Sequence, residues 1–295
     1  MLDLAFPYFF FLNYEPTGLS KEILLKDQFR QRIEELQDIW RPWSSRFFEV
    51  HRLNIPCLVK YAVFWHRDLS FNNISGNVPK SILNLQMLTF LFLGNNSLTG
   101  GLPDGISPSL TNLDFSYNQL TGSFPSWATQ NNLQLNLVAN NFVLGSNNNG
   151  ILPPGLNCLQ KDTPCFRDYS FAVDCGSNRS IRGSDNTMYE MDSTNLGDSS
   201  YYVTSQTRWG VSNVGKLFQS PNDSKIIYSN ETIQNAVDSE LFQTARISPS
   251  SLRYFGLGLE NGNYIVVLQF AELGYPDSQT WQSLGRRVFD IYIQV

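Results

Sequence analysis

The sequence contains few charged residues and no excess of positive charge. Of its 295 residues, 16% are Asp, Glu, Lys or Arg, well below the roughly 25% of average soluble chains, and the net charge is −5. An acidic chain without a run of Lys or Arg lacks the positive surface that binds a polyanion. The composition therefore argues against nucleic acid as a partner.

Long apolar runs are also lacking. No segment approaches the roughly 18 apolar residues of a membrane-spanning helix, so the sequence as given predicts no membrane span. The run from Leu4 to Leu12 is a candidate signal-peptide core, but Asp3 replaces the expected basic start and Pro7 interrupts the run.

Cysteine and histidine are scarce. The four cysteines are too few for a disulfide scaffold and lack the Cys-x-x-Cys spacing of a zinc site. No histidine follows His66, so none is available in the later sequence to activate Cys175 as a nucleophile. We expect no catalytic residue, metal or cofactor in this chain.

A repeat with a period of 22 to 24 residues is the strongest positive signal. Each copy centres on an Asn, preceded by alternating apolar residues and followed by a Gly-x-Leu-Pro-like half. A period of 20–29 residues with this pattern is typical of leucine-rich repeats. The central residues are Asn72, Asn96, Asn118 and Asn140.

Each part of the repeat has a physical role. The Leu-x-Leu pair predicts a short strand with alternate side chains in the core, so Leu91 and Leu93 should be buried. The Asn should turn the chain while its amide satisfies backbone groups that stacking would leave unpaired. Gly tolerates the positive φ of the return segment, and each coil must pack on its neighbours.

The same repeats resemble those of plant leucine-rich-repeat receptor ectodomains, and they assign residues 68–144 to a short solenoid. The x positions of its strands should form an exposed face. Two adjacent aromatics there would make an apolar patch suited to a peptide or a partner domain. The residues expected on this face are Phe90, Phe92, Asp114 and Ser116.

Residues 1–67 do not continue the repeat. Apolar residues between Lys21 and Trp40 fall at helical spacing and predict an amphipathic helix. Stepping back 24 residues from Leu91 reaches Arg67, where a core leucine is expected. We interpret this segment as a product of truncation or mis-joining, with an unusual helical cap as the alternative.

His66-Arg67-Asp68-Leu69, followed by Asn73, matches the catalytic loop of protein kinases. No Gly-rich phosphate loop or strand lysine precedes it, and the repeat explains the same residues. We interpret the match as coincidence.

Residues 145–165 are expected to link and cap the solenoid. Cys158 and Cys165 lie seven positions apart, and their pairing would close its apolar end; two buried free thiols are the alternative. Cys57 and Cys175 are expected to be unpaired.

From Tyr169 onward, short aromatic and β-branched runs alternate with Gly, Asn and Ser clusters, which predicts a β-sandwich. Tyr264 to Phe270 and Arg287 to Val295 are expected strands, and one or two helical turns are possible between Ser229 and Phe242. The whole chain is therefore expected to be mainly β.

Residues 166–295 resemble the malectin-like domain of plant receptor kinases. Phe171-Ala-Val-Asp-Cys-Gly176 and Glu240-Leu-Phe-Gln-Thr-Ala-Arg246 are among the segments that carry the resemblance. It implies a recognition module, cut short at Val295. It also implies aromatic platforms for a sugar or peptide, although core packing explains the same pattern. The candidates are Tyr201, Tyr202, Trp209, Tyr254 and Phe255.

The two resemblances together imply an extracellular, non-catalytic ligand-recognition region of a plant receptor-like serine/threonine kinase. Its partner would be a peptide, a cell-wall glycan or a co-receptor ectodomain. A secreted decoy without a kinase is one alternative. A carbohydrate-active enzyme is another, with Glu240, Glu272 and Asp290 as its carboxylates. Candidate N-glycosylation sites, whose number is near that expected by chance, are Asn73, Asn95, Asn178, Asn222 and Asn230.

Overall fold

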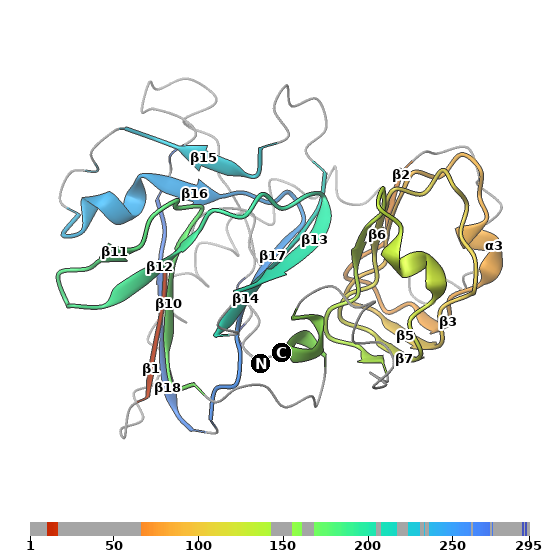
Figure 1. Ribbon diagram of the computed structural model, residues 1–295, viewed down its shortest axis with the longest axis horizontal. Coiled ribbons are helices and arrows are strands. Elements are labelled where there is room, and N and C mark those ends of the chain that lie inside the picture. The colour runs from red at the N-terminus through yellow and green to blue at the C-terminus, as the bar shows by residue number, and fades with distance from the viewer. Residues whose placement is uncertain are drawn as a thin grey trace, which may run out of the picture.

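A computed structural model gives the architecture of the chain. It describes the backbone of residues 11–16 and, in full, residues 66–142, 155–160, 168–204, 208–216, 224–230, 236–260 and 262–271, with residues 233, 273, 291 and 293. The expected helix between Lys21 and Trp40 and the expected strand from Arg287 to Val295 lie outside these ranges. Figure 1 shows a short solenoid beside a β-sandwich.

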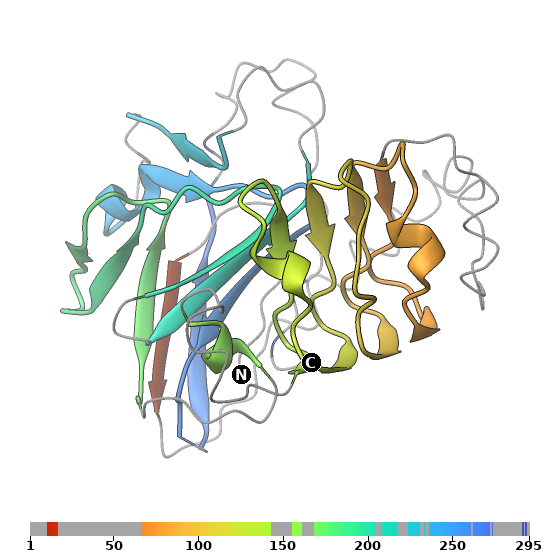
Figure 2. The same ribbon diagram turned by 45° about the vertical axis from the view of Figure 1, so that its right-hand side comes forward.

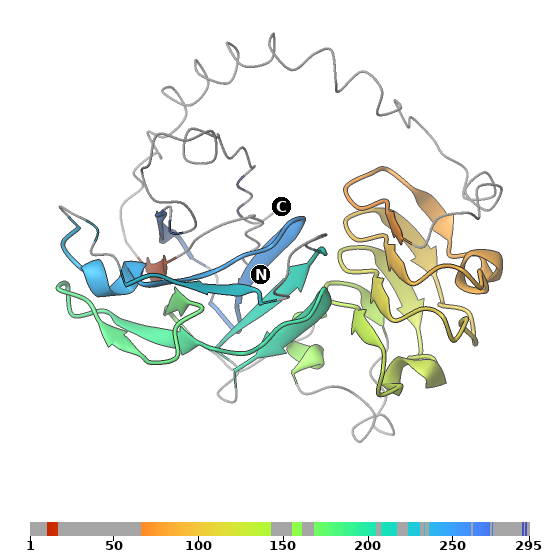
Figure 3. The same ribbon diagram turned by 90° about the horizontal axis from the view of Figure 1, so that it is seen from above.

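Two parallel four-stranded sheets form the solenoid, and each coil contributes one strand to each sheet. The coils follow one another as a short stack, and their strands line up side by side (Figures 2 and 3). The leucine-rich-repeat fold expected for this region is thus confirmed. The first sheet is β2 (His66–Asp68), β4 (Phe90–Phe92), β6 (Asn112–Asp114) and β8 (Gln134–Asn136), and the second is β3 (Ser75–Asn77), β5 (Ser97–Gly100), β7 (Gln119–Gly122) and β9 (Asn141–Phe142).

The repeated asparagines join successive coils. The Oδ1 atom of Asn118 accepts a hydrogen bond from the backbone N–H of Leu98 at 2.9 Å, and its Nδ2 donates to the carbonyls of Leu93 and Phe115 at 3.0 Å. Asn96 and Asn140 make the equivalent bonds one coil earlier and one coil later. The role expected for the asparagines is confirmed.

Backbone geometry repeats with the same period. The residue before each of three asparagines, at Asn95, Tyr117 and Ala139, has a φ between 54° and 57°. Gly100 and Gly122, in the return segments, have φ values of 74° and 88°, as the pattern predicted.

The ladder begins at His66, slightly before the expected start of the solenoid at Asp68. In the parallel pairing of β2 with β4, Arg67 lies opposite Leu91. Arg67 is only half-buried because it belongs to the first coil of the described ladder. The cost of burying a guanidinium in the core is thereby avoided.

Apolar residues of all four coils form one core, which includes Leu91, Leu93, Leu113, Phe115 and Leu120. One side of the core is closed by the short helix α3 (Lys80–Leu83) and the 3-10 turn η1 (Ser126–Thr129). Two of their residues, Ile82 and Trp127, belong to the same core. Figure 1 shows α3 on the side of the solenoid away from the sandwich.

A second 3-10 turn, η3 (Leu156–Leu159), closes the far end of the solenoid. The backbone N–H of Ala139 donates to the carbonyl of Leu159 at 2.7 Å. Cys158 in this turn is disulfide-bonded, and Cys165, its expected partner, lies outside the described residues. Cys175 is a buried free thiol, as expected.

The sandwich contains a five-stranded sheet, a three-stranded sheet and a two-stranded ribbon. Residues of the two larger sheets, including Phe171, Val173, Trp209 and Tyr254, pack together in its core. The five-stranded sheet has the order β11 (Ile181–Arg182), β12 (Met188–Asp192), β10 (Phe171–Cys175), β1 (Phe11–Pro16) and β18 (Tyr264–Gln269). The three-stranded sheet consists of β13 (Ser199–Val203), β14 (Trp209–Val214) and β17 (Ser251–Gly256). The ribbon pairs β15 (Ile226–Tyr228) with β16 (Thr244–Arg246), and the turn η4 (Ser239–Phe242) precedes β16.

Strand β1 was not expected from the sequence. It lies between β10 and β18 and pairs with both in antiparallel register, with Leu12 opposite Val173 and Leu268. Two residues of the candidate signal-peptide core, Phe11 and Leu12, therefore belong to a sheet of the sandwich. The expected strand from Tyr264 is confirmed as β18, and η4 supplies the helical turn expected before Phe242.

Candidate functional site

The strand face of the solenoid has the predicted register. Leu91 and Leu93 are in the core, whereas Phe90 and Phe92 lie on the opposite face, where both line a groove shared with the sandwich. The expected exposure of this face is wrong for most of its residues. Phe92 is only 4% exposed, and Asp114 and Ser116 are also buried.

The sandwich causes this burial because β13 packs against β6 and β8. The Ser199 hydroxyl donates to the carbonyl of Leu113 at 2.6 Å, and the Asn136 amide donates to the Ser212 hydroxyl at 2.7 Å. Gln134 Oε1 accepts hydrogen bonds from the backbone N–H of Asp198 at 2.7 Å and from the Asn112 amide at 2.8 Å.

A mixed apolar cluster continues the contact. It joins Val138 and Ala139 of the last coil to Leu159 of the cap and to Phe255 and Leu257 of the sandwich. The rings of Tyr117 and Phe255 stack, with 6.2 Å between centroids, and the Arg253 guanidinium lies 3.7 Å from the Tyr117 centroid. The repeats and the sandwich therefore share a buried interface.

Beside this interface, the groove has a volume of about 340 Å³. Its solenoid wall comes from β2 and β4, and its other wall comes from the segments after β14 and before β17. Phe90 is half-buried in this wall and packs on His66, with 4.6 Å between their ring centroids. The remaining lining residues are Arg67, Asp68, Phe92, Gly215, Lys216, Pro249 and Ser250.

One cation is held in place over the aromatic wall. The ammonium of Lys216 lies 4.8 Å from the centroid of Phe90 and 3.1 Å from Asp198 Oδ2. Lys225 binds the other oxygen of the same carboxylate at 2.7 Å. Burial and the nearby positive charge of Lys216 lower the pKa of His66 below its ordinary value, which favours a neutral imidazole.

The sandwich aromatics do not form the platform that the sequence suggested. Trp209, Tyr254 and Phe255 are fully buried, so the stacking role predicted for them is wrong. They pack in the core because their strands are covered by a sheet or by the solenoid. Tyr201 and Tyr202 are half-buried, and each packs against an apolar cluster.

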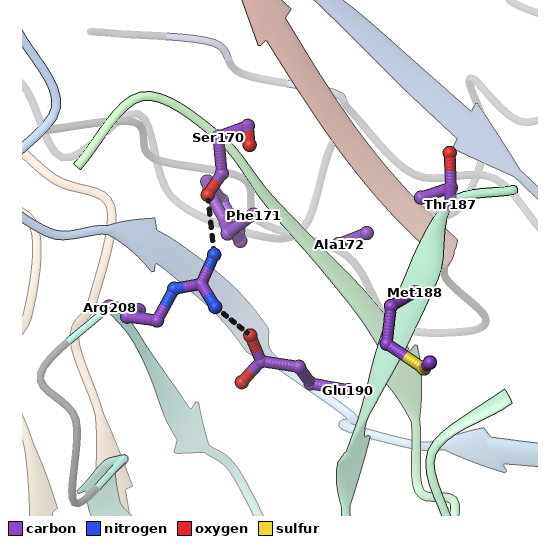
Figure 4. A pocket seen from close by; sticks show the side chains of 7 residues that line it. All are labelled: Ser170, Phe171, Ala172, Thr187, Met188, Glu190 and Arg208. Carbon is purple, nitrogen blue, oxygen red and sulfur yellow. Dashed lines mark hydrogen bonds and ion pairs between the residues drawn. The ribbon is translucent and has the colours of Figure 1, made fainter. Parts of the chain in front are cut away.

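Sequence reasoning missed a small polar pocket of about 240 Å³ on the sandwich. Figure 4 shows the Arg208 guanidinium between the Ser170 carbonyl and Glu190, with Thr187 and Met188 on the other side. Arg208 also binds Asp168 at 2.7 Å. Both carboxylates are engaged by the one guanidinium, so this network mainly ties β12 to the segments that precede β10 and β14.

The other expected sites have mixed outcomes. Four of the glycosylation candidates (Asn73, Asn95, Asn178 and Asn230) are exposed, and Asn222 lies outside the described residues. Glu240 forms an exposed ion pair with Arg179, while Glu272 and Asp290 lie outside the described ranges.

Two negative findings apply to the described residues alone. They contain no cluster of His, Cys, Asp or Glu arranged to hold a metal, and no helix with the length and apolarity to cross a bilayer.

Family models match both parts of the chain. Residues 169–295 match the malectin domain, and residues 87–108 and 109–131 match the leucine-rich repeat. Both resemblances drawn from the sequence are thereby confirmed.

The curated relatives are plant receptor-like kinases. A probable LRR receptor-like serine/threonine-protein kinase of Arabidopsis thaliana is 51% identical over 192 residues, which are 63% of this chain and 18% of the relative. Another from the same plant is 36% identical over 230 residues, which are 77% of this chain and 21% of the relative. The chain spans about a fifth of the length of these relatives, whose kinase parts lie outside it.

Solved structures match a smaller part of this chain than the curated relatives do. The Arabidopsis receptor kinase HAESA, in complex with the peptide hormone IDA and the co-receptor SERK1, is 27% identical over 29% of this chain and 15% of that chain, with a TM-score of 0.27. Pollen Receptor Kinase 3 is 29% identical over 31% of this chain and 46% of that chain, with a TM-score of 0.28. From its family matches and curated relatives, the chain is a leucine-rich-repeat and malectin-domain protein related to the plant LRR receptor-like serine/threonine kinases.

Proposed function

We propose that this chain is the extracellular ligand-recognition region of a plant receptor-like kinase and that it binds its ligand in the groove between β2, β4 and the sandwich. The observation that carries the proposal is the pairing of an accessible aromatic wall with a fixed cation. Phe90 and His66 provide flat apolar surface, and Lys216 provides a charge that Asp198 holds over Phe90.

The interface supports this location. The strand face over β6 and β8 is covered by β13, so a ligand that approaches the described strand face can reach it only near β2 and β4. A pocket of mostly apolar surface with a few placed polar groups is the usual form of a recognition site.

A peptide fits this groove better than a glycan does. An apolar side chain could pack on Phe90, while an acidic side chain or carboxylate could meet Lys216 or Arg67. A cell-wall oligosaccharide, a co-receptor ectodomain and a decoy role without a kinase are the rivals. Among the described residues, the Arg208 pocket does not favour catalysis, because Glu190 in the pocket and Asp168 beside it are both engaged by the guanidinium.

The test is a binding screen with the whole chain, in which the solenoid and the sandwich stay connected. The secreted chain is presented to a pool of synthetic acidic and neutral peptides and, separately, to a set of plant cell-wall oligosaccharides. We expect a peptide to bind and Phe90→Ser to weaken its affinity at least about tenfold, the loss typical of an interface anchor. Lys216→Gln should weaken acidic peptides more than neutral ones.

Met87→Ser is the matched control because Met87 is 54% exposed and does not line the groove. It should leave affinity unchanged. Binding of oligosaccharides alone would favour the rival ligand. If no probe binds, or if Phe90→Ser binds the peptide with unchanged affinity, the groove is not the binding site.

A further inference from the structure

A third hollow, of about 330 Å³, lies on the sandwich away from the groove. Its lining comes from the loop after β10, from β11, from η4 and from the β15–β16 ribbon. Its lining includes Asn178, which is the acceptor of the sequon Asn178-Arg179-Ser180. The other three described sequon asparagines do not line this hollow.

The loop that carries Asn178 is fixed at its backbone. The Ser177 hydroxyl donates to the carbonyl of Arg179 at 2.8 Å and accepts from the Arg179 N–H at 3.3 Å. Gly176, just before it, has a φ of 86° and packs so closely that a Cβ atom would meet Ala245 at 3.0 Å. Asn178 is therefore held at the rim, while its own amide is exposed.

The rest of the lining has the chemistry of a carbohydrate contact. Tyr228 is 62% exposed and borders the hollow, so its ring is accessible to a bound sugar. Polar groups of Gln243, Thr244 and the exposed Arg179–Glu240 ion pair surround it. Aromatic rings that combine a flat apolar face with a polar rim suit the apolar face and hydroxyl groups of a sugar.

We propose that Asn178 is N-glycosylated and that the first N-acetylglucosamine of this glycan lies in the hollow against the ring of Tyr228. Asn178 and Tyr228 line the same hollow, so a sugar linked to Asn178 enters the space that the ring of Tyr228 borders. The glycan would thereby cover an exposed aromatic and connect the β10 loop to the ribbon. The inference rests on the proposed function only in requiring that the chain enters the secretory pathway.

The test uses the full chain, secreted from insect cells behind a heterologous signal sequence. Glycopeptide mass spectrometry first measures occupancy of Asn178. A peptide N-glycosidase then acts on the folded protein, and the rate of glycan release is followed separately at Asn178 and at Asn73. Asn73 is the internal control because it is exposed on the solenoid and lines none of the three hollows described here.

In the unsubstituted chain we expect Asn178 to be occupied and its glycan to be released more slowly than that of Asn73. Tyr228→Ala should speed release at Asn178 about fivefold, the factor that corresponds to about 1 kcal/mol of ring contact. Release at Asn73 should not change. Tyr228→Phe should keep the slow rate because it retains the ring, and it controls for any general loosening of the ribbon.

An unmodified Asn178 overturns the proposal, as does a release rate that is the same with and without the Tyr228 ring. Failure of the groove to bind any peptide or oligosaccharide would leave this result intact. The two proposals therefore fail separately.

Discussion

The solenoid and the sandwich satisfy their buried polar groups in different ways. In the solenoid, neutral amides repeat at a fixed spacing, and each bridges one coil to the next. In the sandwich, charged groups are buried as ion pairs. Among the described residues the most deeply buried pair is Arg246 with Asp192, which are inaccessible to solvent and whose closest atoms lie 2.6 Å apart. The Tyr254 hydroxyl donates to the same carboxylate at 2.6 Å.

This difference determines how the stability of each domain should change when one of its buried polar groups is removed by substitution. Loss of one amide removes bonds between neighbouring coils only, because each coil contacts only its neighbours. The ion pair instead links three strands, β12, β16 and β17, which are far apart in the sequence. Removing one partner leaves an uncompensated charge at the centre of the fold, so the effect should be global.

The largest effect is therefore expected for Arg246→Met. It should destabilise the sandwich by about 3–5 kcal/mol because Asp192 would remain buried without its cation. Arg179→Met is the matched control, since Arg179 forms an exposed ion pair with Glu240 and should contribute less than about 1 kcal/mol. Urea unfolding followed by Trp fluorescence measures both. Equal losses of stability in the two variants would show that the buried ion pair contributes no more than the exposed one.

Acidic pH should stabilise the folded state through two buried carboxyl groups, those of Asp174 and Asp114. Burial raises the pKa of Asp174 in the sandwich to about 7 and that of Asp114 in the interface to about 6, from an ordinary value of 3.8. The folded state thus keeps protons that the unfolded state has released. Each group's stabilisation is complete below pH 4 and is lost as pH rises through the folded pKa, by up to about 1.4 kcal/mol per pH unit.

Substitution separates the two carboxyl groups. Asp174→Asn should flatten the pH dependence of stability between about 4 and 7, and Asp114→Asn should flatten it only between about 4 and 6. Unfolding free energies measured at half-unit steps from pH 4 to 8 check this. A pH profile that is unchanged in both variants would show that these carboxyl groups ionise normally.

Asn118→Ala should have a smaller and more local effect. It leaves the N–H of Leu98 without its side-chain acceptor, while the carbonyl of Leu93 keeps the bond from the Asn96 amide, and the loss should cost about 1–3 kcal/mol. Amide exchange should speed up in the adjacent coils and stay unchanged in β10 and β12. Asn84→Ala is the control because Asn84 is exposed beside α3, outside the ladder. Equal protection throughout both domains would contradict nearest-neighbour behaviour.

The solenoid could be predicted well from the sequence because its asparagines and apolar residues recur at a regular spacing. Asn96, Asn118 and Asn140 could be assigned a role from spacing alone. The partner of Arg246 could not, since Asp192 is 54 residues away and no repeat marks the pair. Burial of Phe92 and Asp114 was missed for the same reason: their register is local, whereas the sandwich that covers them comes from a distant part of the chain.

The smallest effect on stability, and the sharpest on domain coupling, is expected at Gln134. Its Oε1 atom accepts bonds from Asp198 and Asn112, and a Cβ atom at Gly197 would collide with its side chain, so the amide fits closely between the domains. Gln134→Ala removes that acceptor from the Asp198 N–H and the Asn112 amide, and because Gln134 is itself exposed and water can replace it, the cost should be about 0.5–1 kcal/mol. The loss falls on contacts between the domains, so the solenoid and the sandwich should unfold in two separable steps. Gln130→Ala, on an exposed residue of the same coil, should leave their unfolding unchanged. Differential scanning calorimetry distinguishes the outcomes, and an identical thermogram for both variants would show that the apolar cluster around Phe255 alone couples the domains.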